Sequence, residues 1–354
     1  MERLGWDSFF EDHFQTLKVP GSVPGRVVSE SRGSYQVQSQ YGVLTARIVG
    51  KMRYGQAGRK ALPVVGDWVV TKPLANEHMA TIHAVLPRRS RFSRKVAGRR
   101  TEEQVLSANI DTVFIVSGLD GGRNLSLRRI ERYLALARSS GATPVIVLNK
   151  VDLCPDVDSL IQEVEDIAPG TAIRAVSATE RIGLEALRNY LTKKHTVAFL
   201  GPSGVGKSAL INALLGTDRQ EIGEVREDDR KGRHTTTRRE LIMLPDGGMV
   251  IDTPGMREIQ MWVGDDDLQD AFHDIETLGK RCRFNDCSHN SEPGCTVREA
   301  IANGELDPSR LSSYKRLQKE LTDLASREQH SARLHEQSKW KKISQWSKEI
   351  DKRL

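Results

Sequence analysis

The sequence predicts a chain in three parts: a small N-terminal β-barrel, a central α/β domain built on a parallel sheet, and a mostly helical C-terminal domain. Short β-rich runs separated by turn residues fill residues 23–86, and apolar strands alternate with helical segments from residue 112 to about 255. Strand patterns end after residue 265. We place the boundaries at 1–22 (an N-terminal extension), 23–87 (the barrel), 88–107 (a basic linker), 108–265 (the α/β domain) and 266–354 (the C-terminal domain).

The composition indicates a soluble globular protein, with 38% hydrophobic and 28% charged residues. A formal charge of +6 and a pI near 9.1 favour a polyanionic partner. The first residues mix acids and bases among apolar residues, which is not the pattern of a signal peptide, and no run of about 18 apolar residues occurs. We expect a cytoplasmic protein without membrane contact.

The barrel prediction depends on five runs, "RVVSE", "SYQVQS", "VLTARIV", "DWVVT" and "TIHAVL". A five-stranded barrel of this size indicates an OB-fold, whose exposed face often binds oligonucleotides. A barrel that only packs against its neighbour fits the pattern equally well.

Two basic segments lie outside the α/β domain. Residues 88–100, "RRSRFSRKVAGRR", hold seven basic residues, no acid and the aromatic Phe92, which suits phosphate contacts more than a merely solvated face. Residues 333–354 hold seven Lys or Arg against three acids, with Trp340, Ile343 and Ile350 at near-helical spacing. This tail is either a helix packed on its own domain or an arm that binds RNA.

The α/β domain begins with "TVFIVSGL" and continues through "PVIVLNK", "AIRAVSA", "TVAFLGPSG", "ELIMLP" and "GMVIDTPG", with helical segments between several of these runs. Such alternation predicts six strands in a doubly wound sheet covered by helices. Ligands of these folds bind at the carboxyl ends of the strands.

The stretch "GPSGVGKS" fits G-x-x-x-x-G-K-S/T and follows a strand-like run. Its glycines allow backbone N–H groups to wrap around a phosphate, Lys207 neutralises phosphate oxygens, and Ser208 offers a hydroxyl to Mg²⁺. We therefore predict a nucleotide site that includes Gly201, Pro202, Ser203, Gly204, Val205, Gly206, Lys207 and Ser208.

Two later segments complete the phosphate side of this site. In "DTPG", Asp252 is predicted to hold Mg²⁺ through water and Gly255 to offer its N–H to the γ-phosphate. In "GRHTTT", one of Thr235, Thr236 and Thr237 is predicted to join Mg²⁺ when the γ-phosphate is present, and to leave it after hydrolysis.

The tetrapeptide "NKVD" predicts that the base is guanine. Asp152 would accept hydrogen bonds from the guanine N1–H and 2-amino group, a donor pair that adenine lacks, while Asn149 would brace the loop and the Lys150 stem would cover the base. Ser177 and Ala178 follow "AIRAV", and the Ala178 N–H is expected to reach the guanine O6. The predicted ligands are thus GTP and GDP.

Three of the four cysteines and a histidine form the pattern C-x4-C-x-H-x5-C: Cys282, Cys287, His289 and Cys295. Four such ligands fill a tetrahedron, so the pattern predicts one structural Zn²⁺. Burial as small apolar residues is the alternative, and the polar neighbours argue against it. Cys154 lies apart and is interpreted as a packed or incidental thiol.

In order along the chain, the five nucleotide elements are NKxD, SA, the phosphate loop, the threonines and DxxG, which resembles a circularly permuted GTPase. With the barrel and the cysteine pattern, the chain resembles the ribosome small-subunit-dependent GTPase A family (RsgA, also called YjeQ) over nearly its whole length. The resemblance implies an OB-fold, a permuted GTPase domain and a zinc-binding domain. It also implies GTP hydrolysis stimulated by the 30S subunit during its late maturation, binding to 16S rRNA, and use of Zn²⁺ and of Mg²⁺ with GTP. We expect a monomer.

Ras-like enzymes place a glutamine after the DxxG glycine to orient the attacking water, and this chain has Met256 there. His234, beside the threonines, is the candidate catalytic residue, and the family's "RHTTT" match supports it. Arg233 and Arg238 are weaker candidates as charge stabilisers.

Two functions from different classes follow. The first is a GTPase that assists 30S assembly. The second is an RNA-binding assembly chaperone whose nucleotide site only gates affinity. The basic linker and tail disfavour a metabolic or transport NTPase.

Overall fold

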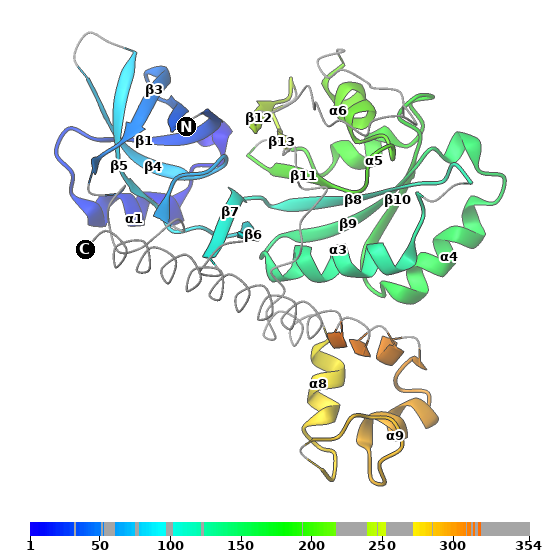
Figure 1. The fold of residues 1–354 in the computed structure, drawn as a ribbon. Coiled ribbons are helices and arrows are strands. Elements are labelled where there is room, and N and C mark those ends of the chain that lie inside the picture. Colours follow the sequence, from blue (N-terminus) through cyan, green and yellow to red (C-terminus); the bar gives the residue numbers. More distant parts are fainter. Residues whose placement is uncertain are drawn as a thin grey trace, which may run out of the picture. The chain divides into compact units, whose positions relative to one another are not determined.

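The structure is a computed structural model in which the chain divides into two compact units, residues 1–95 with 103–262 and residues 96–102 with 263–354. It describes residues 1–31, 33–50, 52, 61–74, 78–96, 102–121, 124–192, 194–216, 239–245, 247–252, 272–284, 286–308, 310–312, 314–315 and 318–319. Figure 1 shows the elements of both units.

The first unit begins with a closed five-stranded barrel. Its strands are β1 (Val23–Ser31), β2 (Ser34–Ser39), β3 (Gly42–Ile48), β4 (Trp68–Pro73) and β5 (Met79–Val85). Pairing runs in the order β1-β2-β3-β5-β4, and β4 pairs again with β1, which closes the barrel. Alternate residues of β2 are buried because one face of the strand points inward. The predicted barrel is confirmed.

The N-terminal extension packs on this barrel. It forms a short 3-10 helix, η1 (Glu2–Leu4), and α1 (Ser8–Leu17), which begins where the Asp7 carboxylate accepts a hydrogen bond from the Phe9 N–H at 3.1 Å. The Trp6 ring meets the buried Trp68 ring of β4 with centroids 4.7 Å apart. This aromatic contact fixes the extension to the barrel.

The six strands of the α/β domain follow in the order β10-β9-β8-β11-β13-β12. They are β8 (Thr112–Gly118), β9 (Thr143–Asn149), β10 (Ala172–Val176), β11 (Thr196–Leu200), β12 (Glu240–Met243) and β13 (Met249–Asp252). Every residue of β8 and β11 is buried because helices cover both faces of the sheet. The helices are α3 (Leu127–Ser139) and α4 (Val157–Ile167) on one face and α5 (Leu184–Arg188) and α6 (Lys207–Leu215) on the other (Figure 1).

One strand departs from the predicted parallel sheet. β12 pairs with β13 in the antiparallel sense, with Glu240 opposite Asp252. The reason is the connection, in which the Leu244 N–H donates to the Gly248 carbonyl at 2.8 Å in a tight turn. A turn this short joins only antiparallel neighbours, since a parallel pair needs a crossover of a dozen or more residues.

The barrel and the α/β sheet are continuous within the first unit. β1 pairs with β12 at Ser29 and Glu240, which joins the two sheets. Two further strands, β6 (Arg91–Val96) and β7 (Glu102–Ala108), form a separate two-stranded sheet. Arg26 of β1 is only 2% exposed and reaches into the junction. Its guanidinium donates to the Leu4 carbonyl, the Gly66 carbonyl (3.3 Å), the Asn109 carbonyl (3.0 Å) and the Thr196 hydroxyl (2.8 Å).

The second unit, in its described residues, contains α8 (His273–Gly279) and α9 (Thr296–Ala302), joined by the segment that holds the cysteines. The Arg310 side chain pairs with Asp274 of α8, and the Tyr314 hydroxyl donates to Glu276 at 2.6 Å. Within the described ranges of both units, each helix is too short or too polar to cross a bilayer.

Candidate functional site

The predicted nucleotide loops meet at one edge of the α/β sheet. β10, β9, β8, β11 and β13 are mutually parallel, so their carboxyl ends share that edge. Gly118 of β8 and Val176 of β10 both pair with Asn149 of β9, which aligns the three strand ends. The loops after β9, β10 and β11 are therefore the "NKVD", "SA" and "GPSGVGKS" segments. This arrangement explains how loops in permuted order form one site.

The phosphate loop has the backbone that its glycines predict. Gly201, Gly204 and Gly206 adopt φ values of 153°, 82° and 94°, and α6 begins directly after the loop. The Lys207 ammonium donates to the Gly201 carbonyl at 2.7 Å and the Pro202 carbonyl at 2.5 Å, so it lies against the loop backbone. Ser208 is in the first turn of α6. The loop can therefore offer N–H groups, an ammonium and a hydroxyl to phosphate and its metal.

Asn149 connects the base loop to the phosphate loop. Its side chain is buried, its amide donates to the Val205 carbonyl at 2.8 Å, and its amide oxygen accepts from the Ala178 N–H at 3.1 Å. A Cβ on Gly206 would lie 2.2 Å from the Asn149 amide nitrogen, so only glycine fits there. One side chain thus joins three of the predicted elements, as the bracing role of Asn149 requires.

The second base segment is buried. Ser177 is 0% and Ala178 9% exposed, and the Ser177 hydroxyl accepts from the Glu180 N–H at 3.0 Å. The Ala178 N–H already donates to Asn149, a bond that the sequence did not reveal. Its predicted bond to guanine O6 would have to share this donor, and that role stays a prediction.

Lys150 and Asp152 lie where the strand ends. Asp152 is exposed within a short 3-10 helix, η3 (Val151–Leu153). Lys150 has φ 67° and ψ 38°, a left-handed conformation that is uncommon outside glycine and is concentrated at functional sites. Its ammonium lies 2.7 Å from the Asp120 carboxylate. Sequence reasoning missed Asp120; its one signal was an acid in a glycine-rich loop directly after a buried strand.

Part of the predicted site lies outside the described residues. These positions are Thr235, Thr236, Thr237, Gly255 and the candidate catalytic His234, together with Arg233, Arg238, Met256 and the basic tail. Asp252 is the last residue of β13, so its backbone ends at the same sheet edge as Gly201. That placement is compatible with the predicted role of Asp252.

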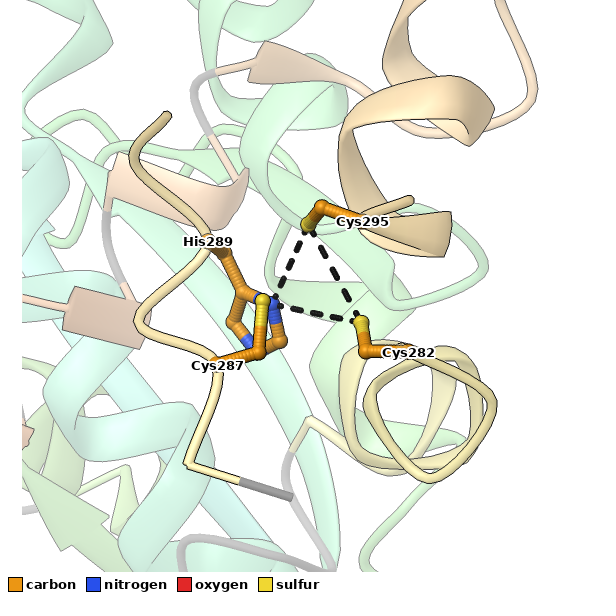
Figure 2. Close-up of side chains that lie close together, drawn as sticks. All are labelled: Cys282, Cys287, His289 and Cys295. Atoms are coloured by element: carbon orange, nitrogen blue, oxygen red, sulfur yellow. Dashed lines mark hydrogen bonds between the residues drawn. The ribbon is translucent and has the colours of Figure 1, made fainter. Parts of the chain in front are cut away.

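The four predicted metal ligands come together in the second unit. Their ligand atoms all lie within 4.8 Å of one another, and Figure 2 shows the three sulfurs and the imidazole facing a common centre. The Cys282 and Cys295 sulfurs are 3.9 Å apart, and the Cys295 sulfur lies 3.4 Å from the His289 Nδ1. A tetrahedral ion bonded at about 2.3 Å separates two sulfurs by about 3.8 Å, so this donor set fits zinc.

Local structure holds these ligands in place. Cys295 is the residue that precedes α9, and His289 has a left-handed φ of 56°. The Lys315 ammonium donates to the His289 carbonyl at 2.7 Å, which supports the loop from outside. Burial and the Lys315 charge lower the pKa of His289, which favours the neutral imidazole that can bind a metal.

Part of the basic stretch is used inside the protein. The Arg88 guanidinium pairs with the fully buried Asp67 at 2.7 Å, and Arg89 pairs with Asp7 at 2.7 Å while covering the Phe9 ring. Phe92, a candidate aromatic for nucleic-acid contact, is 0% exposed. These side chains stabilise the first unit, a role that charge counting did not predict. Cys154 is partly buried and belongs to no metal cluster in the described chain.

Comparison with known proteins agrees with this geometry. The family model described as RsgA GTPase matches residues 85–262. An ABC transporter model matches residues 184–350, which include the phosphate loop, but less than half of the chain. The small ribosomal subunit biogenesis GTPase RsgA of Opitutus terrae is 46% identical over 98% of this chain and 96% of its own length. The small ribosomal subunit biogenesis GTPase RsgA 2 of Lactiplantibacillus plantarum is 45% identical over 90% of this chain and 89% of its own length.

Two solved structures have the same fold. The crystal structure of YjeQ from Thermotoga maritima is 29% identical, with a TM-score of 0.64 over 85% of this chain and 99% of that one. The structure of YloQ, described as a circularly permuted GTPase, is 23% identical with a TM-score of 0.61 over 85% of this chain and 96% of that one. At that identity the second likeness concerns the fold alone.

Proposed function

The chain belongs to the RsgA GTPase family, and we propose that it hydrolyses GTP to GDP and phosphate in the biogenesis of the small ribosomal subunit. The observation that best supports a working nucleotide site is Asn149, which bonds both to the phosphate loop at Val205 and to the base segment at Ala178. These bonds hold the two halves of the site at a fixed separation. A nucleotide whose base and phosphates span that separation would therefore meet a base segment and a phosphate loop that are already held in place.

The proposed roles follow from the chemistry of each side chain. Lys207 would neutralise the β- and γ-phosphate oxygens, and the exposed Asp152 would accept hydrogen bonds from the guanine edge. Ser208 and Asp252 would hold the Mg²⁺ that accompanies GTP, with one of the threonines 235–237 added when the γ-phosphate is present. When bound, Mg²⁺ neutralises charge that develops on the phosphates. The Gly255 N–H would donate to the γ-phosphate.

We assign the orientation of the attacking water to His234, because Met256 has no hydrogen-bonding group to do so. Replacing His234 by Ala should lower subunit-stimulated turnover by about 10²-fold or more and leave GDP affinity unchanged. Stimulated turnover equal to wild type, with normal binding, would remove His234 from the mechanism.

The second unit would carry one structural Zn²⁺ on Cys282, Cys287, His289 and Cys295. All four ligand positions of a tetrahedral ion are then taken by the protein, so the metal has no open position for chemistry. Its role would be to hold the fold of this unit. The organisation we propose for the chain is an N-terminal barrel, a basic linker, a permuted GTPase domain and a zinc-binding domain, with the boundaries predicted from the sequence.

The proposed partner is the 30S subunit, bound through 16S rRNA by a cytoplasmic monomer. The net charge of +6 and the basic tail support a polyanionic partner. Phosphate contacts would make binding weaken steeply with salt, which a cosedimentation series at increasing KCl would reveal.

The deciding experiment measures GTP turnover with and without 30S subunits, alongside cosedimentation with 30S, 50S and 70S particles. We expect stimulation by 30S alone, and tighter 30S binding with a non-hydrolysable GTP analogue than with GDP. Nucleotide-dependent binding without stimulated turnover would instead identify an RNA-binding assembly chaperone whose nucleotide site only gates affinity. Equal binding in both nucleotide states would refute the coupling between nucleotide and subunit.

A further inference from the structure

Asp120 and Asn124 form a polar cluster with Lys150 of the "NKVD" loop, and neither of the two has a part in the roles assigned above. Asp120 lies in the loop after β8, next to the loop after β9 that carries Lys150, because the Leu119 N–H donates to the Asn149 carbonyl at 2.8 Å. One Asp120 carboxylate oxygen receives both the Lys150 ammonium at 2.7 Å and the Asn124 amide at 2.6 Å. The cluster therefore fixes the far end of the Lys150 side chain.

Both ends of Lys150 are thus constrained. Its backbone is held in the left-handed conformation at φ 67°, and its ammonium is held by a carboxylate that is 18% exposed. The stem between them lies over the Gly118 backbone, since a Cβ at Gly118 would be 3.6 Å from the Lys150 Cδ. A free lysine side chain loses rotamer entropy when it is ordered, and here that ordering is already present before a ligand binds.

The electrostatics of the pair agree with a permanent contact. Burial would raise the pKa of Asp120, but the hydrogen bonds and charge from Lys150 and the Asn124 amide outweigh it and hold the pKa below its ordinary value. The other Asp120 oxygen is buried and, in the described part of the chain, accepts no hydrogen bond. The carboxylate charge is therefore compensated mainly by Lys150.

We propose that Asp120 is a positioning residue for guanine nucleotides: it pins the Lys150 ammonium so that the lysine stem is preformed as a flat apolar cover for the base. Asp120 touches no part of the nucleotide in this role and acts only through Lys150. The inference rests on the proposed function, because it needs a purine bound beside Asp152. It names a residue that sets affinity by preorganisation.

The proposal predicts the pattern of effects in enzyme kinetics. The cover contacts the base equally in the GTP, transition and GDP states, so its loss removes uniform binding. Asp120→Ala should raise KM for GTP about tenfold and change kcat by less than about twofold. Because a stem over the ring face does not distinguish purine edges, the preference for GDP over IDP should stay the same, whereas a change at Asp152 should abolish it.

The test is isothermal titration calorimetry with GDP and IDP on the full chain, using Asp120→Ala, Lys150→Met and the double variant. We expect each single change to weaken GDP binding about tenfold, and the double variant to bind no more weakly than Lys150→Met. Any of three results would overturn the proposal. The first is a double variant in which the two losses of affinity multiply, the second is an Asp120→Ala variant that binds GDP as tightly as wild type, and the third is an altered ratio of GDP to IDP affinity.

Two controls keep the test decisive. Glu163→Ala on the exposed face of α4 should leave GDP binding unchanged. If Asp120→Ala unfolds, Asp120→Asn replaces it, because the amide keeps the shape and one acceptor of the carboxylate. Asp120→Asn should weaken GDP binding about threefold. An affinity equal to that of wild type would count against the proposal. Wild-type protein that binds GDP no better than ADP would refute the proposed function itself, whereas a guanine-specific wild type with an unaffected Asp120→Ala refutes only this inference.

Discussion

The two compact units are stabilised by different means. The first buries a large apolar cluster between the α/β sheet and the helices α5 and α6, a second cluster inside the barrel, and a polar junction around Arg26. The second buries few large side chains among its described residues, chiefly Phe272, Ile275, Val297, Leu306, Leu311 and Tyr314. Small folds with so little apolar burial usually need a metal or disulfides. Among the described residues, the difference indicates that a metal on the Cys₃His cluster would supply stability that apolar burial supplies in the first unit.

The largest expected effect is removal of the metal. A structural zinc site contributes roughly 10 kcal/mol or more of apparent binding free energy, and because the site forms only in the folded state, that energy stabilises the fold. Chelation, or Cys295→Ser, should make the second unit sensitive to proteolysis while the first unit still binds GDP. Metal content by mass spectrometry, limited proteolysis and GDP calorimetry would check this.

Cys154→Ser is the matched control, because this thiol lies outside the cluster. It should leave metal content and proteolysis unchanged. If metal-free protein keeps a protease-resistant second unit, the comparison between the units fails.

Arg26→Met should destabilise the first unit without affecting the metal. The change leaves the carbonyls of Leu4 and Asn109 and the Thr196 hydroxyl without the buried donor that they share. We expect a loss of about 3 kcal/mol in the free energy of unfolding, measured in urea by tryptophan fluorescence. Arg26→Lys keeps the charge but not the fork of donors, so it should also destabilise. A loss below about 1 kcal/mol would mean that apolar packing alone holds the junction.

A smaller effect is expected for an ion pair in the second unit. Asp274 accepts from Arg310 at 2.9 Å, but the two side chains are 40% and 24% exposed. Asp274→Asn should therefore cost about 1 kcal/mol or less in the metal-loaded protein, measured by thermal unfolding of the second unit. Arg298→Gln, on the exposed side of α9, is the control. A cost similar to that of metal loss would show that ion pairs, not the metal, dominate.

Local patterns in the sequence were enough to predict most of the fold. The barrel strands, the alternating α/β segments and the four metal ligands are each specified by residues close together in the chain. The antiparallel β12 was missed because strand direction depends on the connection at Leu244 and Gly248 rather than on apolar periodicity. The tight turn could have been recognised from the short "PDGG" segment between the two runs.

Contacts between distant segments could not be predicted. Arg26 donates to acceptors as far apart in the chain as Leu4 and Thr196. The residues beside it in the sequence, "PG" and "VV", give no sign that its side chain is buried. The Asp120–Lys150 pair likewise exists because two parallel strands end side by side, a fact of topology and not of spacing. The count of basic residues also predicted that Arg88 contacts phosphate at the surface, whereas the Arg88 side chain pairs with the buried Asp67. Long-range partners decide whether a charged side chain is structural.

The smallest expected effect concerns the pH dependence of the junction between barrel and sheet. Burial raises the pKa of Glu30 above its ordinary value of 4.5, and the Arg239 charge at 3.8 Å only partly opposes this. The folded state therefore binds this proton more tightly than the unfolded state, so the Glu30 contribution to stability falls as pH rises from 4.5 through the raised pKa. Glu30→Gln removes that fall, and its stability relative to wild type should be higher at pH 7 than at pH 4.5. Because Glu30 is 34% exposed, solvent screening limits the difference to less than about 1 kcal/mol. Urea unfolding at pH 4.5 and pH 7 measures the free energy of unfolding of the variant and of wild type, with Glu163→Gln as the exposed control. If Glu30→Gln differs from wild type by the same amount at both pH values, Glu30 does not make the stability of the junction depend on pH.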